Sequence, residues 1–141
     1  MLKRKLRILI ADDEKFASTL LQGILSEFGE CELASDGHEA LFSFENNIKK
    51  KIRYDLICLD IQMPIVDGHS ALKKIRNLEL KYKIPQRERT KILMITSKNA
   101  TDSGMYSIEN QCDGYITKPA NYSVLVQKLK EFNLIGNTVK L

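Results

Sequence analysis

The chain has 141 residues, a length that suits one domain with one hydrophobic core. Its composition, 43% hydrophobic and 28% charged, is that of an ordinary soluble protein, and no apolar run is long enough to span a bilayer. The N-terminal residues become acidic too early for a signal peptide and the net charge is only +4, so we predict a cytoplasmic protein that neither enters a membrane nor binds nucleic acid directly.

The first half of the chain alternates short apolar runs with stretches of helical spacing. Strands are predicted over residues 6–11 and, more weakly, over 31–35. A helix is predicted over 14–29, and its inner stripe repeats every four residues: Phe16, Leu20, Ile24 and Phe28. A second helix, over 36–48, places three apolar residues inward: Ala40, Leu41 and Phe44.

The second half of the chain continues the same alternation. Strands are predicted over 54–60, 90–97 and within 112–119, and helices over 67–82, 101–111 and 121–132. The expected inner face of the helix over 67–82 is Leu72, Ile75 and Leu78 or Glu79. That of the last helix, which Asn121 is expected to cap, is Val124 or Leu125, then Leu129 and Phe132. The order of strand then helix, repeated five times, indicates right-handed βαβ units and a parallel sheet covered on both faces.

Several features of the sequence are predicted to carry no chemistry. Two connections, 46–53 and 81–89, are long and polar; we interpret them as tolerated insertions, with partner surfaces as the alternative. The basic clusters Lys3–Lys5 and Lys49–Arg53 have no interleaved aromatic residues and are predicted to be solvated. The cysteines are odd in number and far apart, so we expect small core residues and neither a zinc site nor disulfides: Cys31, Cys58 and Cys112.

Polar residues follow the predicted strands, at the carboxyl ends that should meet along one edge of a parallel sheet. Asp12 and Asp13 follow the first strand, Asp60 ends the third, Thr96 lies at the end of the fourth and Lys118 at the end of the fifth. Clustered carboxylates need a counter-charge, and ligands that offer only oxygen suit Mg²⁺. A carboxylate, Mg²⁺, a lysine and a hydroxyl are the groups that phosphoryl transfer to an aspartate requires.

The residues around Asp60 support this assignment. A rigid strand would aim the Asp60 carboxylate out of the sheet edge, which suits a nucleophile. Pro64 stiffens the loop that follows, and Asp67 and Gly68 are expected to start the next helix. The main-chain carbonyl of Gln62, within this loop, is a candidate metal ligand.

The acidic pair Asp12-Asp13, "DIQMPIVDG" around Asp60, Thr96 after "ILMI" and "YITKP" with Lys118 together resemble the receiver domain of two-component response regulators, over residues 6–132. The resemblance implies an α/β, flavodoxin-like fold: a doubly wound (βα)5 three-layer sandwich with strand order 2-1-3-4-5. It also implies that Asp60 takes a phosphoryl group from a sensor histidine kinase or a histidine phosphotransfer protein. Mg²⁺, or Mn²⁺ in its place, would be held by Asp13, Asp60 and the Gln62 main-chain carbonyl, and by Asp12 partly through water.

The same resemblance makes Thr96 and Tyr115 a switch pair. As Thr96 moves toward the phosphoryl oxygens it vacates a volume that Tyr115 can rotate to fill, because a packed interior does not leave volume empty. The alternative interpretation of Tyr115 is an ordinary, half-exposed strand aromatic. In the family, the peptide bond before the equivalent of Pro119 is commonly cis.

We predict a single receiver domain over residues 1–141, with its core over 6–132 and a tail over 133–141. It would act as a stand-alone switch that contacts a downstream protein, as chemotaxis regulators do, either as a monomer or as a weak phosphorylation-dependent dimer. It would be no conventional enzyme, because its only chemistry would be Mg²⁺-dependent self-phosphorylation from a phosphodonor and autodephosphorylation. The alternatives are a receiver cut from a longer regulator and a phosphorylation-independent binding module. A phosphatase of the haloacid dehalogenase type is disfavoured, because Gln62 occupies the position of its acid/base aspartate.

Overall fold

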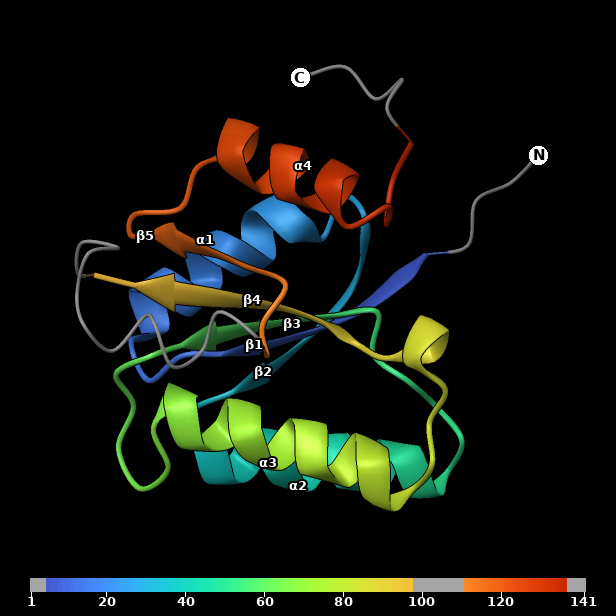
Figure 1. The fold of residues 1–141 in the computed structure, drawn as a ribbon. Coiled ribbons are helices and arrows are strands. Elements are labelled where there is room, and N and C mark those ends of the chain that lie inside the picture. Colours follow the sequence, from blue (N-terminus) through green and yellow to red (C-terminus); the bar gives the residue numbers. More distant parts are fainter. Residues whose placement is uncertain (1–4, 98–110, 137–141) are drawn as a thin grey trace.

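A sheet of five parallel strands forms the centre of the computed structural model, which describes residues 5–97 and 111–136 (Figure 1). The strands are ordered β2-β1-β3-β4-β5, which confirms the predicted order 2-1-3-4-5. Their bounds are β1 (Leu6–Ala11), β2 (Gly29–Ala34), β3 (Leu56–Asp60), β4 (Lys91–Thr96) and β5 (Gly114–Thr117).

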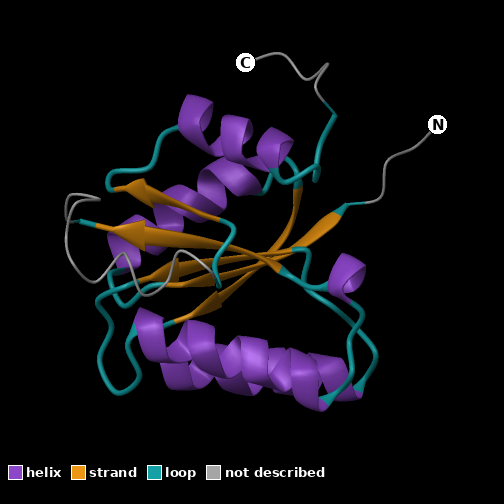
Figure 2. Ribbon diagram, in the orientation of Figure 1, coloured by secondary structure: helices purple, strands orange, loops and turns teal. Residues whose placement is uncertain are grey.

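Helices cover both faces of the sheet, so the predicted three-layer sandwich is confirmed (Figure 2). One face is covered by α1 (Lys15–Leu25) and α4 (Tyr122–Glu131), and the other by α2 (Gly37–Lys49) and α3 (Gly68–Lys81). A short 3-10 helix, η1 (Gln86–Glu88), lies in the connection from α3 to β4. The helix predicted over 101–111 lies outside the described residues, apart from Gln111. Within the described ranges, no helix has the length and apolarity to cross a membrane.

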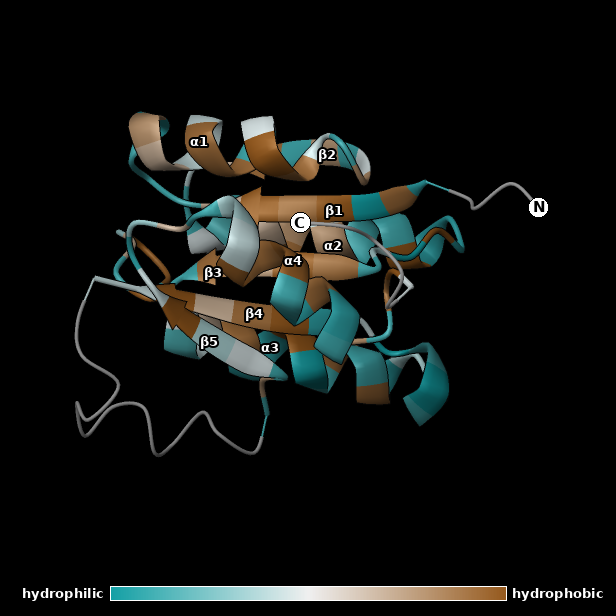
Figure 3. Ribbon diagram, turned by 90° about the horizontal axis from the view of Figure 1, so that it is seen from above, coloured by the Kyte–Doolittle hydropathy of each residue, from teal (hydrophilic) through white to brown (hydrophobic). Residues whose placement is uncertain are grey.

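The central strands are apolar throughout because both of their faces are covered. Every residue of β3 is buried, and Figure 3 shows β1, β3 and β4 as mostly hydrophobic. Alternate side chains enter opposite cores, as the two-residue period of a strand requires. Ile57 and Leu59 pack on the side of α2 and α3, whereas Leu56 and Cys58 pack on the side of α1 and α4.

The predicted inner stripe of α1 is wrong at its start. Phe16 is 83% exposed, and the buried residues of the helix are instead Ser18, Leu21 and Leu25. Each residue advances about 100° around a helix, so a stripe spaced by four residues drifts by about 40° per step and cannot face one core along its whole length. Leu20 and Ile24 are accordingly half-buried. The predicted end of the helix at residue 29 is also wrong, because α1 ends at Leu25 and Gly29 already begins β2, so Phe28 lies in the turn between them.

The other helices resolve the alternatives that the spacing left open. In α4 the inner residue is Leu125, and Val124 is 38% exposed. Of the two alternatives in α3, Glu79 is fully buried and Leu78 is half-buried. The remaining inward predictions are confirmed, except that Leu41 is only half-buried: Ala40, Phe44, Leu72, Ile75, Leu129 and Phe132. The cysteines form no disulfide; one is buried and two are half-buried: Cys58, then Cys31 and Cys112.

Candidate functional site

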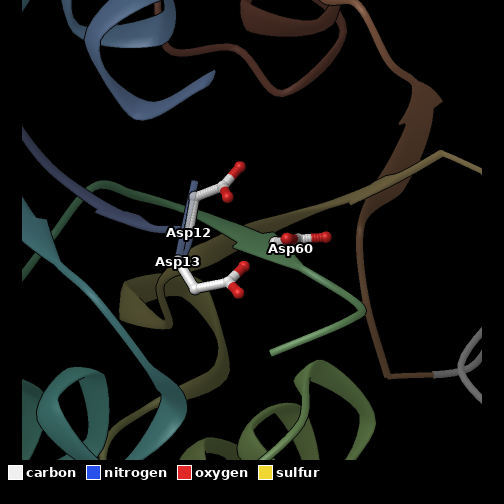
Figure 4. Close-up of side chains that lie close together, drawn as sticks. All are labelled: Asp12, Asp13 and Asp60. Atoms are coloured by element: carbon white, nitrogen blue, oxygen red, sulfur yellow. The ribbon is translucent and has the colours of Figure 1, made fainter. Parts of the chain in front are cut away.

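The ends of the central strands bring the predicted polar residues to one edge of the sheet. Asp60 is in register with Ile95, and Thr96 with Thr117, so the ends of β3, β4 and β5 lie side by side. Asp12 follows β1, where its backbone N–H donates to the carbonyl of Ala34 at the end of β2. Figure 4 shows that Asp12 and Asp13 reach this edge from β1 while Asp60 reaches it from β3.

Three carboxylates converge at this edge. One oxygen from each of Asp12, Asp13 and Asp60 lies within 4.8 Å of the others, so together they can hold a metal ion. Asp12 and Asp60 are buried, whereas Asp13 is exposed to solvent. The donor set is oxygen-only, half enclosed and strongly anionic, which fits a hard divalent cation such as Mg²⁺ that keeps some of its waters.

Lys118 supplies the positive charge that the structure places among these acids. Its Nζ lies 3.0 Å from Asp12 Oδ2 and 3.2 Å from Asp60 Oδ2. It also lies 3.0 Å from Oε1 of Glu14, a residue that the sequence prediction left out of the site. Glu14 is the third acid of the run that begins at Asp12, and that run was the available signal. The backbone N–H of Lys118 donates to the Thr96 carbonyl at 2.7 Å, and the bond to Pro119 is cis, as the resemblance implied.

The electrostatics of the carboxylate cluster favour the binding of positive charge. Burial, and then the neighbouring charge of Asp12, raise the pKa of Asp60 from 3.8 to about 6. Lys118 and a hydrogen bond from the Gln62 N–H act in the opposite direction. Partial burial would lower the pKa of Lys118, but its bonds to Glu14 and Asp12 and the charge of Asp60 raise it overall, so Lys118 stays protonated.

The loop after β3 is held close behind Asp60. The Gly68 N–H donates to the Ile61 carbonyl at 2.9 Å, and a Cβ at Gly68 would lie 2.7 Å from Ile61 Cα and collide with the Asp60 carbonyl oxygen. Only glycine permits this approach. Asp67 caps α3 by accepting from the Ser70 N–H at 2.9 Å, so this pair starts the helix as predicted.

The structure places the remaining predicted residues at or near this edge. Thr96 is buried at the end of β4. Gln62 is exposed, and its side-chain Oε1 lies 3.5 Å from Ser97 Oγ. Tyr115 lies on β5, three residues before Lys118, and is half-buried against the core under α2 and α3. Tyr115 is therefore a neighbour of the carboxylate cluster and not a member of it.

A family model described as the response regulator receiver domain matches residues 8–130. The chain belongs to this family. As a receiver domain it is a component of two-component signalling, and its relatives include both response regulators and histidine kinases. The transcriptional regulatory protein DltR of Streptococcus agalactiae is 30% identical over 89% of this chain, which spans 50% of the length of that protein.

Two solved structures illustrate the likeness. The first is the co-crystal structure of the Saccharomyces cerevisiae phosphotransfer protein Ypd1 with the receiver domain of Ssk1. It matches with a TM-score of 0.76 at 27% identity, covering 95% of this chain and 92% of that one. The second, the receiver domain of the Arabidopsis thaliana histidine kinase CKI1 with Mg²⁺ and BeF3⁻, has a TM-score of 0.80 at 25% identity, covering 92% of this chain and 91% of that one.

Proposed function

We propose that Asp60 is the phosphoacceptor of this receiver domain. The observation that carries the proposal is the position of Lys118 Nζ, 3.2 Å from Asp60 Oδ2 inside a cluster of three carboxylates. An Asp60 carboxylate oxygen attacks the phosphorus of the donor, and the bond from phosphorus to the donor's leaving atom breaks. In transfer from a phosphohistidine the leaving atom is an imidazole nitrogen, which retains the bonding electron pair and accepts a proton.

The neighbouring residues stabilise the charge that develops during this transfer. Lys118 pairs with one equatorial phosphoryl oxygen, and the Thr96 hydroxyl donates to another. We assign the metal to Asp13, Asp60 and the Gln62 main-chain carbonyl, with Asp12 partly through water. When bound, Mg²⁺, or Mn²⁺ in its place, supplies positive charge to the phosphoryl oxygens. Glu14, 66% exposed, holds Lys118 until the phosphoryl group takes its place.

The proposed phosphodonor is a histidine kinase or a histidine phosphotransfer protein. The co-crystal structure of Ypd1 with the Ssk1 receiver and the receiver of the kinase CKI1 support this class of partner. We propose residues 6–132 as the receiver unit, with output through contact with a downstream protein, as a monomer or a weak phosphorylation-dependent dimer. The same unit serves in a stand-alone regulator or inside a longer chain. Self-phosphorylation and autodephosphorylation would be its only chemistry.

Thr96 and Tyr115 are proposed to convert phosphorylation into a change of shape. Thr96 is buried at the site and Tyr115 is half-buried one strand away, so a shift of Thr96 opens volume toward β5. In Tyr115→Ala, phosphorylation should proceed at the wild-type rate while the phosphorylation-dependent NMR shifts of β5 amides are lost. Unchanged β5 shifts in that variant would mean that Tyr115 is an ordinary strand aromatic.

Intact mass after incubation with Mg²⁺ and acetyl phosphate tests the acceptor. We expect one base-labile phosphoryl group on the wild type and on Asp67→Asn, which changes an exposed helix cap, and none on Asp60→Asn. Lys118→Ala should remain folded and incorporate phosphate more slowly. A wild type that gains no mass from acetyl phosphate or from phosphorylated histidine donors would leave the phosphorylation-independent binding module as the better hypothesis, and an adduct on Asp60→Asn would place the acceptor elsewhere.

A further inference from the structure

Two basic segments meet at the edge of the sheet opposite Asp60. They are residues 49–53, from the last residue of α2 onward, and 81–91, from the last residue of α3 to the first of β4, which together we call the basic end (Figure 1). Thr90 Oγ1 donates to the Tyr54 carbonyl at 2.9 Å, and the Lys91 N–H donates to the Asp55 carbonyl at 3.1 Å, so the two connections are tied together. The basic end holds nine Lys or Arg residues and one Glu, although the whole chain has a net charge of only +4.

The helices α2 and α3 finish at the basic end with the same backbone motif. Lys51 and Lys83 adopt positive φ angles of 61° and 55°. In each case the next residue is an isoleucine, Ile52 or Ile84, whose N–H donates to the carbonyl five residues earlier. This is the Schellman arrangement, in which glycine is usual at the left-handed position because a side chain is strained there. Here lysine occupies that position twice, so two strained positions each carry a positive charge.

Between the two helix ends lies a hollow of about 570 Å³. Its apolar wall comes from Ile48, Ile52, Ile84 and the ring of Tyr82. The Tyr82 hydroxyl donates to Glu45 Oε2 at 2.8 Å, which fixes the ring. A volume of this size lies within the range of sites that bind small ligands or single side chains.

Three cations and one acid complete the lining, and none of these three cations is in an ion pair with another described residue. Lys49, Lys51 and Arg53 line the hollow, with Glu88 as its one acid. Within the part of the chain that the structure describes, the ion pairs of the basic end are Lys81–Glu45 at 3.7 Å, Arg87–Glu88 at 3.8 Å and Lys91–Asp113 at 3.8 Å. Two helix C-termini attract about one elementary charge in total, far less than the basic end supplies.

We propose that this hollow is a docking site for an acidic segment of a partner protein that inserts one apolar side chain. The cationic rim attracts acidic side chains, and the isoleucines and the tyrosine ring offer an apolar floor that phosphates of a nucleic acid would leave unused. The site lies at the far edge of the sheet from Asp60, so it anchors a partner whether or not the receiver is phosphorylated. It stands independently of the proposed phosphoryl chemistry.

The test is fluorescence anisotropy of the whole chain with a short labelled peptide in which one leucine is flanked by glutamates. We expect saturable binding that weakens about tenfold in Arg53→Glu and in Lys49→Glu. Binding should be unchanged in Lys74→Glu, an equally exposed lysine on α3 that does not line the hollow. Asp60→Asn should bind as the wild type does, which separates this site from the phosphorylation site.

Two further probes separate the alternatives. Replacing the leucine of the peptide by serine should abolish binding, and Ile84→Ser should do the same if circular dichroism shows that variant to be folded; Ile52→Ser serves where it is not. Equal binding of the serine peptide, or tighter binding of a single-stranded oligonucleotide that is insensitive to Ile84→Ser, would overturn the proposal and leave a general polyanion surface. Absence of saturable peptide binding by the wild type would overturn it as well.

Discussion

Replacing Asp60 by asparagine should stabilise the metal-free protein. Asp60 is 4% exposed and its carboxylate shares Lys118 with Asp12 and Glu14. Ionising it in the folded state is therefore harder than in the unfolded chain, where the group titrates with its ordinary pKa. Asparagine has nearly the same shape, keeps an oxygen that accepts from the Gln62 N–H, and carries no charge.

The size of the effect follows from the pKa of Asp60, which rises from 3.8 to about 6 on folding. Because the folded-state value is the higher one, the stability associated with the protonated group is fully present below pH 3.8 and is lost as the pH rises through about 6. The linkage relation gives a penalty of about 2 kcal/mol at pH 5 that grows to about 3 kcal/mol at pH 7.5. Asp60→Asn should recover these amounts.

Urea denaturation in EDTA at the two pH values measures this difference. The matched control is Asp36→Asn, a half-buried N-cap of α2 whose side chain accepts from the Glu39 N–H, because asparagine caps a helix as well as aspartate does. That control should change the free energy of unfolding by less than about 0.5 kcal/mol at both pH values. If Asp60→Asn were no more stable than the wild type at pH 7.5, or if its advantage did not grow with pH, the electrostatic account of the cluster would be wrong.

Three more predictions concern the site and its support. Mg²⁺ at 100 times its dissociation constant should stabilise the wild type by about 2.7 kcal/mol in thermal unfolding, and Asp13→Ala should abolish that gain; an equal gain in the variant would remove Asp13 from the metal site. Gly68→Ala should lower the free energy of unfolding by about 1–3 kcal/mol and slow the incorporation of phosphate from acetyl phosphate. Gly23→Ala should leave stability unchanged or raise it, because a Cβ at Gly23 would meet no atom within 4 Å. Arg76→Ala should lower the free energy of unfolding in urea by about 3–5 kcal/mol, because it leaves the buried Glu79 carboxylate without its ion-pair partner. A change as small as that caused by Arg87→Ala, which removes an exposed arginine, would contradict this.

The sheet and the positions of the site residues could be predicted because both follow from local sequence. A parallel strand covered on both faces must be apolar along its length, and a polar residue that ends such a run has to lie at the sheet edge. Asp60 and Thr96 are of this kind, and the register of β3 with β4 places them on adjacent strands. The polar residues that end the apolar runs were therefore enough to predict which side chains meet at the sheet edge, without any information on distant contacts.

What could not be predicted depends on contacts between distant segments. Glu79 is fully buried in α3 because Arg76 Nη1, at 2.7 Å, and the Thr90 N–H, at 2.9 Å, both donate to its carboxylate. Helical spacing cannot show the second of these donors, because Thr90 comes from the connection before β4. Lys118 likewise donates a hydrogen bond to Glu14, from which most of the chain separates it in sequence, and only the fold brings the two together.

The network around Arg76 holds the starts of β4 and β5 in place. Arg76 donates to the Gln111 carbonyl at 2.8 Å and the Thr90 carbonyl at 2.9 Å, and pairs with Asp113 at 3.0 Å. Asp113 in turn accepts from the Ile92 N–H at 2.8 Å, so α3, the start of β4 and the approach to β5 are held together by charged, partly buried bonds. Thr96 and Lys118 lie at the other ends of these two strands, beside the cluster of acids. With the start of each strand fixed, a displacement caused by the proposed phosphorylation would be absorbed toward the carboxyl ends, which is where the proposed switch places the movement of Thr96.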